Sequence, residues 1–239
     1  EKLAEAAFVH TSTEMGRASL IGRGVTAEKI HVIRRGLETF PVWKPLREGR
    51  AAGLRILCVA RLVEKKGIEH QLRIYAAMKE AGMLFEARII GDGPLRGSLQ
   101  ARSVALGVVD CVTFTGHLPQ ADVWGQLAWA DVLVHTAVIA PSGDRDGLPN
   151  VIPEAMSAGV LVVTSPAAAT TEAGQQDVTG IVADVRAVDD WVSAMRELAA
   201  DDQRAERLRV AARTWVEENF DAHKNAARLH ALFMEAMAR

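Results

Sequence analysis

Residues 54–67 read LRILCVARLVEKKG, and the fold of the chain can be worked out from this stretch. Its first half, LRILCVA, is apolar almost throughout, which is typical of a strand buried on both faces of a parallel sheet. A basic loop follows, and apolar residues then recur at helical spacing over residues 67–80. The stretch therefore predicts a buried strand, a polar loop and an amphipathic helix in succession.

The same succession continues along the chain. Further apolar runs predict strands at residues 85–90, 111–115, 131–136, 160–164 and 180–183. Helices are expected between them at residues 95–106, 121–130 and 149–158. Gly159 is a typical C-terminal cap for the last of these. Strands that alternate with helices indicate an α/β fold with a doubly wound, Rossmann-like parallel sheet.

The pattern divides the chain into three parts. Residues 46–188 hold the predicted sheet. Residues 1–45 hold a short helix before Ala7, two strand-like runs and a helix near residues 14–22, too little for a core of their own, and we interpret them as the tail of a preceding domain with a linker. Residues 189–239 are predicted to be helical and to pack on the sheet domain or cross to the preceding domain. Their apolar anchors are Trp191, Met195, Leu198, Leu208, Trp215, Leu229, Phe233 and Met237.

Composition excludes several classes of function. The 239 residues include 28 Lys and Arg against 30 Asp and Glu, a net charge of −2, so bulk charge does not attract nucleic acid. The apolar runs fall short of the ~20 residues that a membrane-spanning helix needs, so no transmembrane segment is expected. Cys58 and Cys111 each lie in an apolar run, which favours buried, reduced thiols and a cytoplasmic location. The histidines show no metal-ligand spacing, and no metal site is predicted.

A basic loop follows the first predicted strand. In an open α/β sheet, ligands bind beyond the carboxyl ends of the strands. Arg61 and Lys66 stand in that position, where an arginine fork and a lysine point charge can neutralise a diphosphate. On this segment alone, a solvated basic turn accounts for them equally well.

The loop after the fourth predicted strand carries acids near a helix start. Asp146 precedes the helix and Glu154 lies inside it. The backbone amides of Asn150 and Val151 can bind a phosphate, while Glu154 can accept hydrogen bonds from two ribose hydroxyls. Alternatively, Asp144, Asp146 and Glu154 cap the helix and balance its dipole.

Four motifs in order resemble a known family. They are RLVEKKG at 61–67, IIGDGP at 89–94, VTFTG at 112–116 and DGLPNVIPEAMSAG at 146–159. Together they resemble the C-terminal, donor-binding domain of the retaining glycosyltransferases of family 4, which have the two-domain GT-B fold. The resemblance covers residues 54–183 closely, and residues 29–38 resemble the crossing from the N-terminal domain more loosely.

The resemblance implies a role for each matching residue. Arg61 and Lys66 match the pair that clamps the donor diphosphate. Asp146 stands where the family usually has a glutamate that contacts the donor sugar, and the aspartate side chain is one methylene shorter. Glu154 matches the glutamate that holds the ribose. The other implied donor-site residues are Gly147, Leu148, Asn150 and Val151 around sugar and phosphate, Gly116, His117 and Leu118 at the nucleobase, and Gly91 in the second motif.

The implied activity is transfer of a sugar from a nucleoside-diphosphate sugar to an acceptor such as a growing glycan or a lipid-linked saccharide. The donor is a substrate, and the resemblance implies neither a cofactor nor a metal. It also implies a partner, the N-terminal domain, without which this chain is expected to be inactive. The implied location is the cytoplasm or the inner membrane face. One departure is that Ala168-Ala169 stands where the family usually has Gly-Gly.

Two other functions compete with this interpretation of the sequence. A dinucleotide-dependent oxidoreductase is disfavoured because Gly97 lies one place too far from Gly91 and Gly93 for the fingerprint, and because the turn follows the second strand rather than the first. A non-catalytic module that binds nucleotide-sugars, or a degenerate homologue, is the alternative to an active enzyme.

Overall fold

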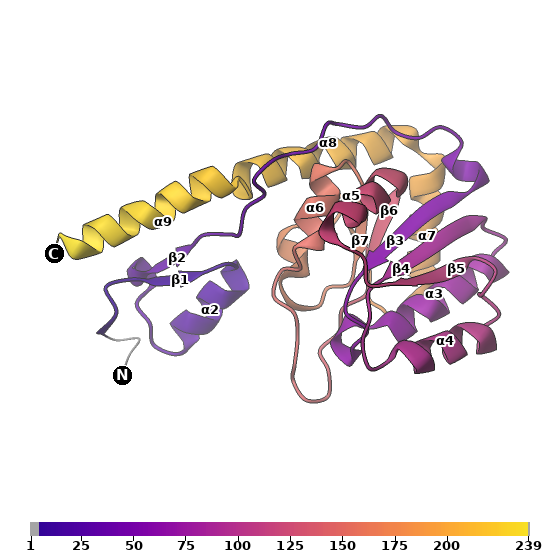
Figure 1. Ribbon diagram of the computed structural model, residues 1–239, viewed down its shortest axis with the longest axis horizontal. Coiled ribbons are helices and arrows are strands. Elements are labelled where there is room, and N and C mark those ends of the chain that lie inside the picture. Colours follow the sequence, from indigo (N-terminus) through magenta and orange to yellow (C-terminus); the bar gives the residue numbers. More distant parts are fainter. Residues whose placement is uncertain (1–4, 239) are drawn as a thin grey trace.

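The computed structural model describes residues 5–238, and its main body is a parallel sheet of six strands between layers of helices (Figure 1). The strands are β3 (Leu54–Val59), β4 (Phe85–Ile90), β5 (Val112–Gly116), β6 (Val132–His135), β7 (Leu161–Thr164) and β8 (Ile181–Val182). Each lies within one residue of its predicted bounds. The order across the sheet is β5-β4-β3-β6-β7-β8, so the winding reverses between β3 and β6 as in nucleotide-binding sheets. The predicted fold class is confirmed.

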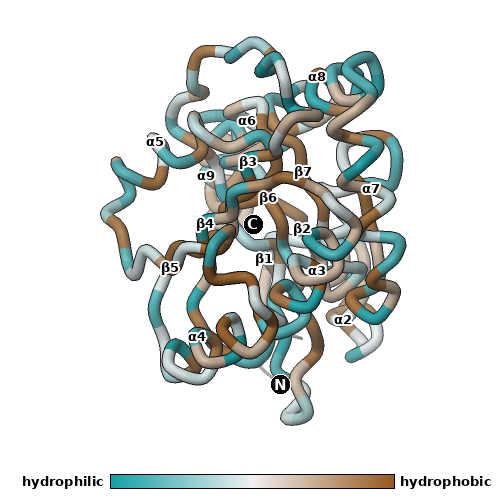
Figure 2. The backbone as a smooth tube through the Cα atoms, turned by 90° about the vertical axis from the view of Figure 1, so that its right-hand side faces the viewer, coloured by the Kyte–Doolittle hydropathy of each residue, from teal (hydrophilic) through white to brown (hydrophobic). Residues whose placement is uncertain are grey.

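Helices cover both faces of the sheet, because successive residues of each strand point to opposite sides. One face carries α3 (Ile68–Glu80), α4 (Arg96–Ala105) and α7 (Val188–Ala200), and the other carries α5 (Gln120–Trp129) and α6 (Val151–Ser157). Ile56 and Cys58 of β3 pack on the α3 side, whereas Leu57 packs on the α5 side. Hydrophobic residues accordingly concentrate along the central strands (Figure 2). Helix α8 (Asp202–Asn219) contributes apolar residues to both clusters.

A smaller N-terminal part lies beside the sheet domain (Figure 1). It contains β1 (Val9–Thr11), α2 (Glu14–Gly22) and β2 (Ile30–Val32), and the two strands pair in parallel. Helix α9 (Ala222–Met237) leaves the sheet domain and runs over this part. There the Phe233 ring meets the Phe8 ring edge-on, with centroids 5.2 Å apart. The helix expected before Ala7 falls almost wholly on residues 1–4, outside the described residues.

Two details of the helices differ from expectation. Phe233 and Met237, two of the predicted apolar anchors, are 53% and 80% exposed, because α9 extends past the sheet domain and contacts the N-terminal part along one side only. Helix α6 begins at Val151 rather than at residue 149, because Asn150 is its N-cap residue. Within the described range, no helix is long and apolar enough to cross a bilayer.

Backbone contacts join the loops at the carboxyl edge of the sheet. The amide of Val138, after β6, donates to the carbonyl of Lys65, after β3, at 2.8 Å. The Thr136 hydroxyl donates to the carbonyl of Gly67 at 3.1 Å. Gly67 has φ +61°, and a Cβ there would collide with the carbonyl oxygen of Thr136, so glycine permits this close approach. The loops that carry the predicted site residues are therefore held together.

Candidate active site

A cluster of opposite charges stands where the winding of the sheet reverses. Lys66 follows β3 and Asp146 follows β6, and the lysine Nζ lies 2.6 Å from the carboxylate Oδ2. Both side chains are largely shielded, at 12% and 11% exposure. Lys65 Nζ lies 3.0 Å from an Asp144 oxygen and 3.7 Å from Asp146. The structure thus brings the predicted residues Lys66 and Asp146 into direct contact.

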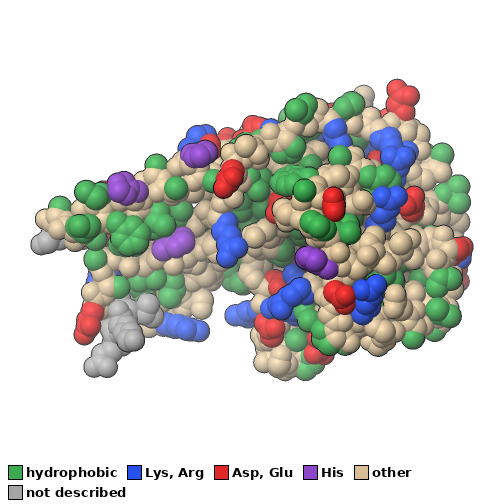
Figure 3. Space-filling model, viewed as in Figure 1, with side chains coloured by type: hydrophobic (Ala, Val, Ile, Leu, Met, Phe, Trp, Pro, Cys, Tyr) green, Lys and Arg blue, Asp and Glu red, His purple; other side chains and the backbone are tan. Residues whose placement is uncertain are grey.

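A cleft of about 610 Å³ opens next to this cluster. Its lining includes Arg61, Asp146, Gly147, Leu148 and Asn150 from the predicted set, with Ser12 and Arg35 from the N-terminal part and Pro149 and Phe220. Arg61 is exposed and makes no ion pair within the described part of the chain. Lys and Arg side chains stand on both sides of the indentation between the two parts (Figure 3). The cleft can therefore hold an anion close to Arg61.

Glu154 lies in α6, apart from the lysine cluster. It is half-buried, and burial raises the pKa of its carboxyl. Gln120, at the start of α5, donates from Nε2 to Glu154 Oε1 at 3.3 Å. Leu118, two residues earlier, packs against the core, while His117 is exposed. Glu154 therefore faces the loop that is expected to border the nucleobase.

Asp144 and Asp146 do not cap α6, whereas Glu154 lies in its first turn, where a carboxylate can balance the helix dipole. The N-cap residue Asn150 makes no side-chain cap hydrogen bond. Asp144 and Asp146 pair with lysines instead. The helix-capping interpretation of these two residues therefore has no support in the geometry.

Two predicted glycines serve backbone packing. The amide of Gly91 donates to the carbonyl of Gly116 at 2.8 Å, which joins the ends of β4 and β5. A Cβ on Gly91, whose φ is +134°, would collide with the carbonyl oxygen of Ala60. Neither glycine is among the residues that line the cleft, so the structure gives Gly91 a supporting position.

His135 is buried at the end of β6, where it is 2% exposed. Its Nε2 lies 3.8 Å from Asp146 Oδ2. Neither ring nitrogen has a hydrogen-bond partner among the described residues. Burial, reinforced by the Lys66 charge and opposed by Asp146, lowers the pKa of the imidazole to about 4. The ring is therefore neutral near pH 7.

The lowered pKa of His135 predicts a loss of stability in acid. The unfolded chain takes up this proton near pH 6.5 and the folded chain only near pH 4, so stability is full above pH 6.5 and falls as the pH drops through this window. The loss amounts to about 3 kcal/mol at most. Urea unfolding at pH 7, 5.5 and 4.5 measures it, and His135→Asn should flatten the decline. An equally steep decline in that variant would assign the effect to other groups.

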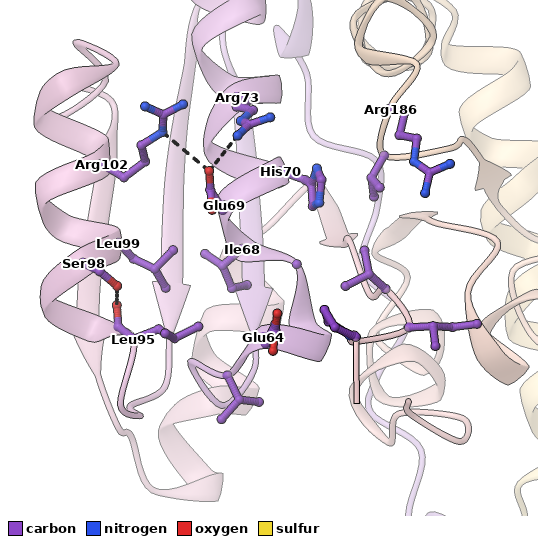
Figure 4. A pocket seen from close by; sticks show the side chains of 16 residues that line it. Glu64, Ile68, Glu69, His70, Arg73, Leu95, Ser98, Leu99, Arg102 and Arg186 are labelled. Atoms are coloured by element: carbon purple, nitrogen blue, oxygen red, sulfur yellow. Dashed lines mark hydrogen bonds and ion pairs between the residues drawn. The ribbon is translucent and has the colours of Figure 1, made fainter. Parts of the chain in front are cut away.

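A second hollow, of about 680 Å³, lies over α3 and α4 (Figure 4). Arg73 and Arg102 both turn toward Glu69 there, at 2.7 and 3.9 Å. Their charge is thus partly neutralised within the hollow. None of Arg61, Lys66, Asp146 and Glu154 lines it. Arg61 and Asp146 line the first cleft instead, whereas Lys66 and Glu154 are not among its lining residues.

Sequence reasoning missed several residues around the cleft. Lys65 lies inside a quoted motif and was given no role, although its charge was visible. Arg35 lies in the crossing segment that was already singled out. Ser12 and Gln120 carried no recognisable signal, because their positions depend on how the N-terminal part and α5 pack.

The strand order and the charged cleft define an α/β domain with a doubly wound parallel sheet. The sequence profile of one family, "Glycosyl transferases group 1", matches residues 50–215. The chain belongs to this glycosyltransferase family.

Curated relatives agree with this assignment, and a solved structure shares the fold. An amylovoran biosynthesis glycosyltransferase, AmsK of Erwinia amylovora, is 33% identical over 204 residues, which are 85% of this chain and 50% of that protein. A GDP-mannose-dependent phosphatidylinositol monomannoside mannosyltransferase of Mycolicibacterium smegmatis is 32% identical over 187 residues, covering 77% and 49%. The Anabaena protein Alr3699/HepE in complex with UDP has a TM-score of 0.80 at 22% identity, covering 96% of this chain and 64% of that one. The chain spans about half the length of these curated relatives.

Proposed function

We propose that this chain is the donor-binding half of a retaining, family 4 glycosyltransferase that uses a nucleoside-diphosphate sugar. The observation that carries the proposal is that Arg61 and Asp146 line one cleft at the reversal of the sheet, where Asp146 is also paired with Lys66. Cations at this position suit a diphosphate, and the adjacent carboxylate suits sugar hydroxyls. Glu154, facing the nucleobase loop, takes the ribose hydroxyls.

The proposed chemistry needs no protein nucleophile. The bond between the anomeric carbon and the diphosphate oxygen breaks, and negative charge develops on the leaving phosphate. Arg61 and Lys66 stabilise that charge. The acceptor hydroxyl attacks from the same face, and its proton passes to the leaving phosphate. In this proposal the two cations take the part that a divalent metal plays in other transferases.

The acceptor side belongs to the proposal as well. An acceptor such as a growing glycan or a lipid-linked saccharide would meet the donor in the cleft between this chain and an N-terminal domain, and the isolated chain would be inactive without that domain. The chain's span of about half its relatives supports this division. A lipid-linked acceptor would place the reaction at the cytoplasmic face of a membrane.

The full-length protein tests the proposal. It is incubated with UDP- and GDP-sugars and candidate acceptors, and the product is examined by NMR. We expect the anomeric configuration of the donor to be kept, and activity to persist in EDTA. An inverted product, or activity that is lost in EDTA and restored only by Mg²⁺, would contradict the mechanism. Donor binding without transfer or donor hydrolysis would favour the non-catalytic alternative.

A further inference from the structure

We propose that His135 is a positioning residue for Asp146. When the donor diphosphate binds Lys66 in place of the Asp146 carboxylate, the His135 imidazole donates a hydrogen bond to that carboxylate. The inference rests on the proposed function, because it assumes that a diphosphate binds at Lys66. It adds a residue that no motif marks, and it assigns Asp146 two alternative partners.

The ligand-free arrangement is unfavourable for an incoming diphosphate. Lys66 is paired with Asp146 at 2.6 Å, and Lys65 approaches the same carboxylate at 3.7 Å. A diphosphate at Lys66 would therefore stand next to a carboxylate of like charge, and like charges in a shielded site repel strongly. Binding is easiest if the carboxylate turns away from Lys66 as the phosphate arrives.

His135 is placed to bind the Asp146 carboxylate once it leaves Lys66. Its ring is buried, and both ring nitrogens lack a hydrogen-bond partner within residues 5–238. Buried polar atoms without partners are rare in folded proteins. Asp146 Oδ2 lies 3.8 Å from Nε2, slightly beyond hydrogen-bond range. A modest rotation of the Asp146 side chain closes this gap, and an imidazole with its proton on Nε2 then donates to the carboxylate.

The two partners differ in freedom to move. His135 lies in β6, where it pairs in register with Thr164 of β7. Asp146 follows an exposed loop, residues 141–145. The imidazole is therefore the fixed point and the carboxylate the moving one. In the donor-bound state, His135 would hold Asp146 at a defined place beside the sugar, which matters because the aspartate side chain is short.

A double-mutant cycle on the 239-residue chain tests the inference, with UDP and GDP as titrants in calorimetry. His135→Leu should weaken binding of the better nucleotide about tenfold, because the carboxylate then stays on Lys66. His135→Asn keeps an N–H donor and should recover most of the affinity. In an Asp146→Ala background, His135→Leu should have no further effect, since the histidine acts through Asp146.

Thr164→Val is the matched control. It alters the buried residue opposite His135 in the register, and it should lower stability without changing nucleotide affinity. An equal loss from His135→Leu with and without Asp146, or no loss at all, would overturn the inference while leaving the proposed function intact. If neither nucleotide binds the wild-type chain, the proposed function fails and the inference falls with it.

A spectroscopic measurement covers the case in which His135→Leu does not fold. The wild-type chain is labelled with ¹⁵N-histidine, and the His135 ring signals are identified by their loss in His135→Asn. Saturating nucleotide should shift these signals in the wild type and leave them unmoved in Asp146→Ala. Signals that stay in place in the wild type, while His117 responds, would also overturn the inference.

Discussion

Replacing Arg61 with alanine is expected to weaken binding of UDP or GDP by about 10- to 150-fold, the loss of one charge-assisted contact worth about 1.5–3 kcal/mol. Replacing Lys66 should cost less, because the lysine must first give up its ion pair with Asp146. Removing both should cost more than either replacement alone and less than about 6 kcal/mol if the two contacts are independent. Calorimetric titration of the chain measures all three variants and identifies the preferred base.

Arg73→Ala is the control for this series. It removes one positive charge from the second hollow, where Arg73 is paired with Glu69, and it should leave nucleotide affinity unchanged. A loss in Arg73→Ala with none in Arg61→Ala would move the nucleotide to the hollow over α3 and α4. Neither single variant should unfold the chain, because Arg61 is exposed and the Lys66 side chain lies outside the two hydrophobic clusters.

The fold could be predicted from sequence because its determinants are local. Each strand is a short apolar run bounded by polar turns, so β3 and β6 were predicted to within one residue at each end. Hydrophobic patterns do not specify which strands pair, so the adjacency of β3 and β6 could not be predicted in this way. That adjacency places Lys66 beside Asp146, although the two residues are 80 positions apart in the sequence. The motif resemblance named both residues, but only the strand order shows that they touch.

The site was predictable where residues share a motif and not where packing alone joins them. His135 is buried at the end of β6, and the apolar pattern of that strand does not show what lies beyond its end. Arg35 and Ser12 reach the cleft because the N-terminal part packs beside the sheet domain. The roles assigned to Arg61, Lys66, Asp146 and Glu154 stay predictions until ligands are measured.

Replacing Glu154 and replacing Asp146 with alanine should affect ligand binding in different ways. Glu154, if it accepts hydrogen bonds from two ribose hydroxyls, contributes whether or not a sugar is attached. Glu154→Ala should therefore weaken nucleoside diphosphate and nucleotide-sugar alike, by about 3–6 kcal/mol for two charged hydrogen bonds. The Glu154→Ala variant should be as stable as the wild type, because burial already penalises the ionised carboxyl of Glu154, as its raised pKa indicates.

Asp146→Ala should change the affinities for nucleoside diphosphate and for nucleotide-sugar differently. Without the carboxylate, Lys66 is free in the unliganded chain, so affinity for nucleoside diphosphate should stay the same or rise. Affinity for the nucleotide-sugar, or turnover in the full-length enzyme, should fall, as expected for a contact made with the reacting group. Asp144→Ala, which removes the neighbouring exposed carboxylate, is the control and should change neither affinity. Equal losses of both ligands in Asp146→Ala would mean that Asp146 organises the cleft as a whole and does not contact the sugar.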